Sequence, residues 1–315
     1  MLKYITRRLL LLPFLLLGIS AVVFILFQLT PGDPISARFG MRLTGMAPET
    51  IAQLRQDLGL NDPLPVQYGR YVANLLRGDL GVSINTRKPV LEEIASRFPA
   101  TLELAVTAMF VIICLSIPLG VLAALNRGKL LDRILMGGAL LGFSMPSFWL
   151  GIMLILLFAL NLRWLPTSGR GDGLLFERLD HLLLPAFTLA IGLVGFNSRI
   201  ARSATLEILG QNYITTAHAK GLSSGTVITR HLLPNTLIPV ITLFALQFAG
   251  MLSGTIVVEM IFAWPGIGRL AVNSVFQRDY PVIMGTTLIF STVYIVMNLI
   301  VDILYPIIDP RIRLS

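Results

Sequence analysis

The alternation of apolar and polar positions divides the chain into six long apolar runs, over residues 9–29, 101–125, 134–160, 182–196, 236–258 and 282–308. A helix rises about 1.5 Å per residue and needs about 20 apolar residues to cross a hydrocarbon core. The fourth run is short as counted, so we expect its helix to continue through Asn197 and Ser198 toward Arg199. The pattern predicts an all-α membrane protein with six transmembrane helices. Prolines at four positions predict kinks in or at the ends of these spans: Pro118, Pro146, Pro185 and Pro239.

The segment between the first and second runs, residues 31–99, is polar and carries only short amphipathic patterns. Three short helices are predicted, around residues 51–58, around 72–76 and over 89–98, the first two stopping at Gly59 and Gly78. The segment has too few apolar residues for a domain with its own core. We therefore expect a small extramembrane cap.

The first apolar run follows Lys3, Arg7 and Arg8, a pattern that a signal peptide also shows. A signal peptide has a shorter apolar region that ends in small residues, whereas this run ends in Thr30-Pro31-Gly32-Asp33-Pro34. We interpret it as a retained anchor. The expected organisation is an anchor helix over 1–30, a cap over 31–99, a five-helix core over 100–308 and a tail over 309–315.

Composition agrees with a membrane protein, because 55% of the 315 residues are hydrophobic and only 13% are charged. The single cysteine, Cys114, lies in an apolar run, which leaves no disulfide framework. The net charge of +8 follows topology: twelve of the 25 Lys and Arg residues fall on the side of the N-terminus, opposed there by Asp132, Glu207 and Asp309 only. The positive-inside rule then predicts cytoplasmic N- and C-termini, and the basic excess needs no nucleic acid to explain it.

A polar, cationic stretch over residues 212–235 interrupts the apolar runs on this same side. Gly221 fits the left-handed C-cap of a short helix whose last turn carries Lys220. A turn at Ser223-Ser224-Gly225 leads to a second short helix, which we expect to end near Pro234. Two short helices in a bend form a compact projection, although a plain connector between spans has the same general pattern.

The spacing within this stretch resembles the membrane-spanning subunits of ATP-binding-cassette (ABC) importers. Their loop reads Glu-Ala-Ala, three residues, Gly, nine residues, an apolar residue, any residue, then Leu-Pro. Here Gly221 is followed by nine residues and then by His231-Leu232-Leu233-Pro234, with Ala217 in the third motif position. Thr215 and Thr216 replace Glu-Ala, and His231 replaces the apolar residue. A contact through the motif glutamate is therefore not expected.

These departures, and motifs elsewhere, resemble the dipeptide, oligopeptide and nickel permeases of the type I importers. The resembling segments are Thr216-Ala217-His218-Ala219-Lys220-Gly221, Arg230-His231, Pro31-Gly32-Asp33-Pro34, Gly78-Asp79-Leu80-Gly81-Val82-Ser83, Trp264-Pro265-Gly266-Ile267-Gly268-Arg269 and Arg278-Asp279-Tyr280-Pro281. They keep their order along nearly the whole chain.

The resemblance implies a transporter subunit in the bacterial inner membrane that imports di- or oligopeptides; nickel, glutathione and opine-like substrates stay open as alternatives. Its implied partners are a second homologous permease, two ABC ATPases, a periplasmic substrate-binding protein and membrane lipid. The loop over 199–235 would couple to the ATPases through Tyr213, Thr215, Thr216, Ala217, His218, Lys220, Gly221, Leu222, His231 and Pro234. Ile214, Ala217 and Leu222 are candidates for seating it in a groove.

The chain itself carries no Walker A motif, since Gly128-Lys129 is followed by Leu130 and lacks the first glycine. We expect it to bind no cofactor, and ATP with Mg²⁺ to be used by the partner subunits. The three histidines are too far apart in the sequence to suggest a metal site. A serine protease built on Ser144 lacks a nearby histidine base, which leaves an ATP-independent channel as the rival outside the class.

Polar residues inside the apolar runs are candidates for the translocation pathway, because burying them in lipid is costly. Hydrogen bonding between helices explains such residues equally well. Asp302, near the end of the last run, has Arg199 and Arg202 as possible partners. The pathway candidates are Ser144, Ser147, Asn197, Gln247 and Ser253.

Overall fold

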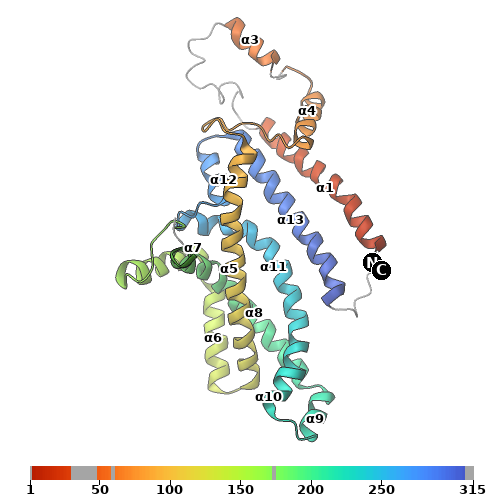
Figure 1. The fold of residues 1–315 in the computed structure, drawn as a ribbon, viewed down its shortest axis with the longest axis vertical. Coiled ribbons are helices and arrows are strands. Elements are labelled where there is room, and N and C mark those ends of the chain that lie inside the picture. The colour runs from red at the N-terminus through yellow and green to blue at the C-terminus, as the bar shows by residue number, and fades with distance from the viewer. Residues whose placement is uncertain (1, 30–47, 58–60, 172–174, 309–315) are drawn as a thin grey trace. The chain divides into compact units, whose positions relative to one another are not determined.

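The structure is a computed structural model that describes residues 2–29, 48–57, 61–171 and 175–308, and the elements it describes are helices (Figure 1). In chain order they are α1 (Leu2–Leu29), α3 (Pro48–Asp57), α4 (Leu64–Leu76), α5 (Val90–Leu125), α6 (Leu130–Ser144), α7 (Ser147–Leu154), the π-helix η2 (Ile155–Asn161), α8 (Leu175–Leu209), α9 (Asn212–Ala219), α10 (Ser224–Val227), the π-helix η3 (Ile228–Leu232), α11 (Leu233–Ile261), α12 (Ile267–Phe276) and α13 (Tyr280–Ile308).

Helices long and apolar enough to cross a membrane occur in five of the six predicted runs. Five such helices are present in the part of the chain that the structure describes, and a sixth span results if α6 and α7–η2 count as one. These two are bent by 105° at Met145-Pro146, so the prediction of one merely kinked helix over 134–160 is wrong. Pro146 is the N-cap of α7 and holds Met145 at an extended ψ of 129°, which a helix cannot continue through.

The other three prolines predicted to cause kinks lie inside helices that continue past them. α5, α8 and α11 continue past Pro118, Pro185 and Pro239. The separate helix predicted over 89–98 is wrong, because those residues are the start of α5, whose buried apolar positions continue without interruption from Val90 to Ile112. The expected extension of the fourth span is confirmed, since α8 reaches Leu209.

The chain forms two compact units: residues 1–99 with 266–295, and residues 100–265 with 296–315. In the first unit, α1 packs on α4 through Phe24, whose ring centroid lies 5.5 Å from that of Tyr68 and 5.8 Å from that of Tyr71. Burial, with Tyr68 alongside, raises the pKa of Tyr71 to about 12. The start of α5 contacts α12 and α13 in an apolar core made by Val90, Ile94, Ile267, Leu270 and Val282.

In the second unit, α6 lies against α8 at very short range (Figure 1). A methyl group added at Gly195 would lie 2.1 Å from the carbonyl oxygen of Ala139, so only glycine allows this approach. The same unit has a continuous core of apolar residues from α5, α8 and α11, closed by Trp264, whose Nε1 donates to the Ala100 carbonyl over 2.8 Å.

Candidate functional site

The segment between α8 and α11 is an ordered helix–turn–helix. α9 ends at Ala219 with Lys220 as its C-cap, and Gly221 follows with φ +80°. Leu222 N donates to Ala217 O over 3.3 Å and Gly221 N to His218 O over 2.9 Å, the two bonds of a Schellman cap. The prediction that Gly221 is a left-handed C-cap is thus confirmed. Nothing lies within 4 Å of a Cβ added there, so backbone conformation alone selects glycine.

The second helix of this segment does not end near Pro234, so that prediction is wrong. α10 continues through η3 directly into α11, with Pro234 in the first turn of α11. Leu233 N donates to Ile228 O, a wide π-type bond, immediately before the proline. This π-type bond lies directly before Pro234, which has no N–H to donate, and the helix continues past the proline.

Burial separates the predicted coupling residues into an inner and an outer set. Ile214 and Ala217 are buried against Val227 of the same segment and Ile208 at the end of α8, so the interpretation that they seat the loop in a partner's groove does not fit the structure. Leu222 is exposed. His231 is partly buried, and the remaining outer residues are Tyr213, Thr215, Thr216, His218, Lys220, Gly221 and Pro234.

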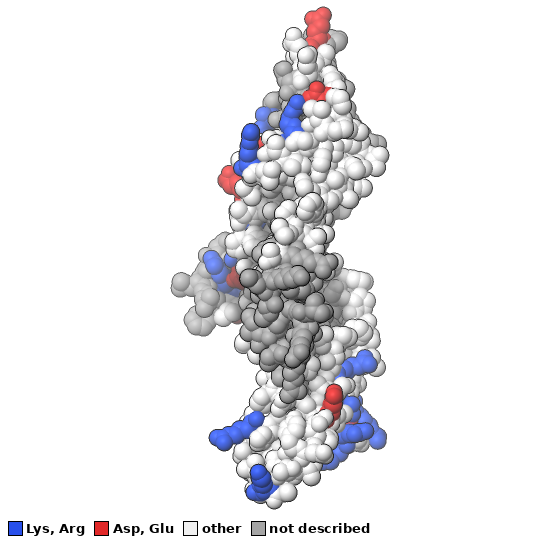
Figure 2. Space-filling model, turned by 90° about the vertical axis from the view of Figure 1, so that its right-hand side faces the viewer, with Lys and Arg blue, Asp and Glu red and all other residues white. Residues whose placement is uncertain are grey.

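Basic side chains gather at this end of the second unit, where they outnumber acidic ones (lower part of Figure 2). Arg202 on α8 forms a two-pronged ion pair with Asp132 on α6: its Nε lies 2.7 Å from Oδ1 and its Nη2 lies 2.8 Å from Oδ2. Gly128 N donates to the same carboxylate over 2.9 Å. Arg202 therefore has Asp132 as its partner, while the side chain of Asp302 lies outside the described residues.

Two of the predicted pathway residues meet inside the second unit. Asn197 on α8 is fully buried, and its Nδ2 donates to Gln247 Oε1 on α11 over 2.7 Å and to Leu193 O over 2.8 Å. Gln247 is partly exposed. Ser144 and Ser147 are exposed on either side of the bend at Pro146, and no contact given by the described residues joins them to this pair. The side chain of Ser253 lies outside the described residues.

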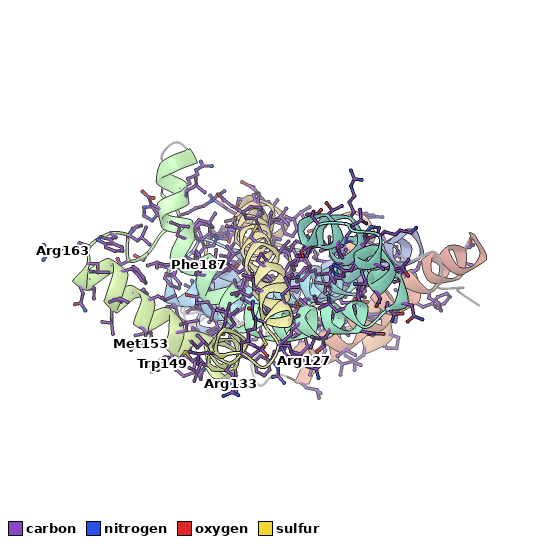
Figure 3. The ribbon with its side chains drawn as sticks, turned by 90° about the horizontal axis from the view of Figure 1, so that it is seen from below. Arg127, Arg133, Trp149, Met153, Arg163 and Phe187 are labelled. Atoms are coloured by element: carbon purple, nitrogen blue, oxygen red, sulfur yellow. The ribbon has the colours of Figure 1, made fainter. Side chains whose placement is uncertain are left out.

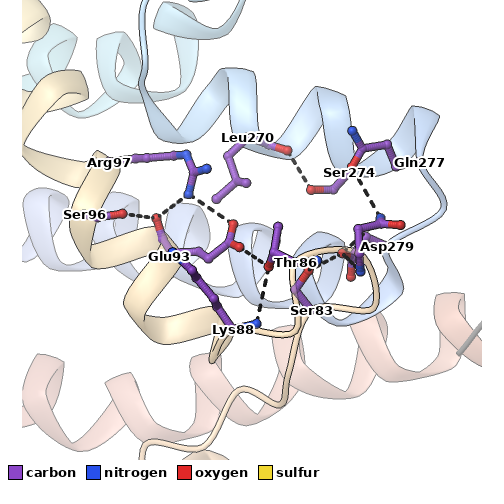
Figure 4. Close-up of polar contacts among 11 residues, drawn as sticks. Ser83, Thr86, Lys88, Glu93, Ser96, Arg97, Leu270, Ser274, Gln277 and Asp279 are labelled. Atoms are coloured by element: carbon purple, nitrogen blue, oxygen red, sulfur yellow. Dashed lines mark hydrogen bonds and ion pairs between the residues drawn. The ribbon is translucent and has the colours of Figure 1, made fainter.

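A polar cluster in the first unit was missed by the sequence analysis (Figure 4). The buried carboxylate of Asp279 accepts from Ser83 Oγ over 2.6 Å, and from Ile84 N, Asn85 N and Asn85 Nδ2, each over 3.2 Å. Ser83 and Asp279 belong to two of the separate motifs noted above, so the sequence contained both residues but did not indicate that they pair. We call residues 83–86 with Asp279 the cap latch.

The cap latch continues into the start of α5. Thr86 Oγ1 donates to the buried Glu93, which also accepts from Arg97 Nη1 over 3.1 Å. Arg87, beside Thr86, adopts φ +58°, a strained value for a residue with a side chain. The loop after α4 is thus held by side-chain bonds to two carboxylates, together with an isolated β-bridge between Val82 and Pro89.

Membrane-length helices with a helix–turn–helix before α11 make a fold that solved structures share. A chain of the inward-facing MetNI methionine ABC transporter matches with a TM-score of 0.57 and 17% identity, over 69% of this chain and 96% of that one. A chain of an amino acid ABC transporter matches with a TM-score of 0.50 and 15% identity, over 70% and 94%. The fold is that of a type I ABC importer permease.

Sequence comparison gives the family. Residues 116–314 match the model of the binding-protein-dependent transport system inner membrane component, and residues 1–105 match the model of its N-terminal part. The chain belongs to this family of ABC importer permeases, as the motifs indicated. It is a multi-pass membrane protein and a transporter subunit, in a family that works with ATPase and binding-protein components.

Full-length relatives are known from several bacteria. The chain is 41% identical to the dipeptide transport system permease protein DppB of Escherichia coli (strain K12), over 338 residues and 99% of each chain. It is 43% identical to the glutathione transport system permease protein GsiC of Salmonella paratyphi A, over 314 residues. It is 42% identical to the di/tripeptide transport system permease protein DppB of Pseudomonas aeruginosa, over 335 residues. The last two matches also cover 99% of each chain.

Proposed function

We propose that this chain is the membrane-spanning subunit of an ATP-driven importer of di- or oligopeptides. The observation that carries the proposal is the identity above 40% with two peptide permeases over the full length of each chain. Glutathione is the second candidate substrate, because the glutathione permease of Salmonella paratyphi A is equally similar. Glutathione is itself a tripeptide, so the two candidates share one chemistry of amide and carboxylate groups.

In this proposal the chain pairs with a second permease, two ATPases bind beneath, and a periplasmic protein delivers substrate. The termini and the α9–η3 segment face the cytoplasm, since the basic residues concentrate on that side. ATP and Mg²⁺ bind to the partner subunits. The assembly resides in a bacterial inner membrane.

The shape of the α9–η3 segment suits the transmission of force. α9 is capped at Gly221 and has its own small core, so it moves as a rigid body when the ATPases close. Its outer face presents Tyr213, His218 and Lys220 to the partner. α8 leads into the segment and α11 leads out of it, and the Asn197–Gln247 bond joins these two helices. A displacement of α9 is therefore transmitted through α8 and α11 to their buried contact at Asn197 and Gln247.

Purification and transport test the proposal directly. The chain is extracted from its native membrane with its partners and reconstituted with its binding protein in vesicles that contain ATP. We expect nucleotide-binding subunits to co-purify, and labelled dipeptides to accumulate only with ATP. Uptake without ATP would instead favour a channel. Glutathione uptake without dipeptide uptake would select the second candidate.

A further inference from the structure

A cleft of about 500 Å³ lies between α6 and α8 and has a charged part and an apolar part. Its volume is typical of a site for a small ligand. Arg133, Met136 and Leu140 line it from α6, at the i, i+3 and i+7 positions that share one helix face. Arg199, Arg202 and Ser203 line it from α8. The cleft is separate from the outer face of α9 and from the Asn197–Gln247 pair.

Three of the seven lining residues are arginines and one is an aspartate, so the lining carries excess positive charge. Asp132 is already neutralised by its two-pronged contact with Arg202. Arg133 and Arg199 are exposed, and neither forms an ion pair with a residue that the structure describes. The open part of the cleft therefore presents two uncompensated guanidinium groups, whose forked donors match the oxygens of a phosphate.

The sequence places these charges at the edge of the hydrocarbon core. Arg133 stands directly before the apolar run over 134–160, and Arg199 closely follows the run over 182–196. Met136 and Leu140 lie about 4.5 Å and about 10 Å further along α6 than Arg133, in the direction of the core. Figure 3 shows Arg133 on the outside of α6.

We propose that this cleft binds one anionic phospholipid. Its phosphate lies between Arg133, Arg199 and Arg202, and an acyl chain lies along Met136 and Leu140. A basic pocket between membrane helices, with apolar residues on its inner side, matches the two-part chemistry of such a lipid. Because Arg202 also ties α8 to α6, the bound lipid reinforces the helix pair that leads into α9.

The test uses the complex purified in detergent and depleted of lipid, with native mass spectrometry to measure binding of phosphatidylglycerol and phosphatidylcholine. The variant Arg133→Gln/Arg199→Gln removes the two uncompensated charges and leaves the Asp132–Arg202 pair intact. At about 1 kcal/mol for each basic side chain near an anionic headgroup, affinity for phosphatidylglycerol should fall roughly 30-fold. Weak binding of phosphatidylcholine should not change.

The matched control is Lys129→Gln/Arg230→Gln, which removes the same charge from exposed positions at the same end but outside the cleft. Unchanged phosphatidylglycerol binding in this control supports a specific site, whereas an equal loss in both variants overturns the proposal. Retention of wild-type affinity by the Arg133→Gln/Arg199→Gln variant also overturns it.

A second variant separates a lipid from a free anion. Met136→Ser should weaken phosphatidylglycerol binding and leave inorganic phosphate binding unchanged. If inorganic phosphate displaces the lipid as readily as a second phospholipid does, the site is a phosphate site and the proposal is wrong. If the isolated chain binds the lipid but the whole complex does not, a partner subunit covers this face, and the proposal fails for the assembled transporter.

Discussion

Single side chains stabilise the loop over 83–86, which lies outside the helices. The carboxylate of Asp279 adds to the backbone bonds of this turn by accepting four hydrogen bonds from three of its residues. The partners are almost two hundred positions apart in the chain, and no periodicity relates them. Their motifs could be noted in the sequence, but their pairing follows only from the packing of α12 and α13 against the start of α5.

We expect Asp279→Asn to release this loop. The amide keeps one acceptor oxygen, but its NH2 group faces groups that are themselves donors. We therefore expect the free energy of unfolding to fall by about 2–3 kcal/mol. Arg87 then becomes a better substrate for trypsin, because cleavage requires local opening of the chain. Digestion followed by mass spectrometry measures the cleavage rate. Asp62→Asn, which breaks an exposed ion pair with Arg70, serves as the control and should not change the cleavage rate. Equal cleavage rates for Asp279→Asn and wild type would show that the cap latch does not hold the loop.

The Asn197–Gln247 bond is the second prediction at this scale. Hydrogen bonds between membrane helices contribute about 0.5–2 kcal/mol, so a double-mutant cycle of Asn197→Ala and Gln247→Ala should show a coupling energy in that range. Denaturation of the purified chain measures stability, and peptide uptake is measured in parallel. Additive effects on stability would mean that the two residues act independently.

The elements show which local signals decide a helix end. Gly221 was predictable, because a glycine after the last helical residue adopts φ > 0 wherever the helix has to stop. Pro146 and Pro234 could not be distinguished by sequence, because apolar residues follow both. Pro146 interrupts the backbone at an extended Met145, whereas Pro234 enters a helix already widened by η3. The difference lies in the turn before each proline, which tertiary packing selects.

Gly221 and Gly225 offer a matched pair for testing coupling. Neither has an atom within 4 Å of an added Cβ, but only Gly221 has a positive φ. Gly221→Val should destabilise the C-terminal cap of α9 by about 1–2 kcal/mol, because valine does not tolerate a positive φ. Peptide uptake and substrate-stimulated ATP hydrolysis should therefore fall together. Gly225→Ala should leave both unchanged. Normal uptake and hydrolysis in Gly221→Val would remove the coupling role.

A further prediction concerns the contact between α6 and α8. Gly195→Ala places a methyl group 2.1 Å from a backbone oxygen of α6, so the helices must separate. We expect a loss of about 1–3 kcal/mol, which outweighs the usual gain of alanine in a helix. Gly138→Ala on α6 meets nothing within 4 Å and should be neutral or slightly stabilising. Thermal unfolding in detergent compares the two; a similar melting temperature for both variants would contradict the close packing.

For the whole molecule, hydrophobic periodicity was sufficient to predict five membrane-length helices but not the bend between α6 and α7, and motif order was sufficient to predict the family. The sequence did not indicate that α12 and the start of α13 group with the N-terminal residues in one compact unit. Grouping of this kind depends on which apolar faces meet, such as Val90 with Ile267 and Val282, and every apolar run has such faces. The side of the membrane on which each loop lies is still a prediction from charge.

Cysteine labelling tests that orientation. Cys114 is the only cysteine, so Cys114→Ser gives a background without thiols. Thr215→Cys lies on the outer face of α9, and Leu76→Cys lies at the end of α4, where the native side chain is 84% exposed. A membrane-impermeant maleimide should label Leu76→Cys in spheroplasts, and Thr215→Cys only in inside-out vesicles, because the basic residues around α9 keep that end in the cytoplasm. Labelling of Thr215→Cys in intact spheroplasts would invert the topology and, with it, the proposed contact between α9 and an ATPase.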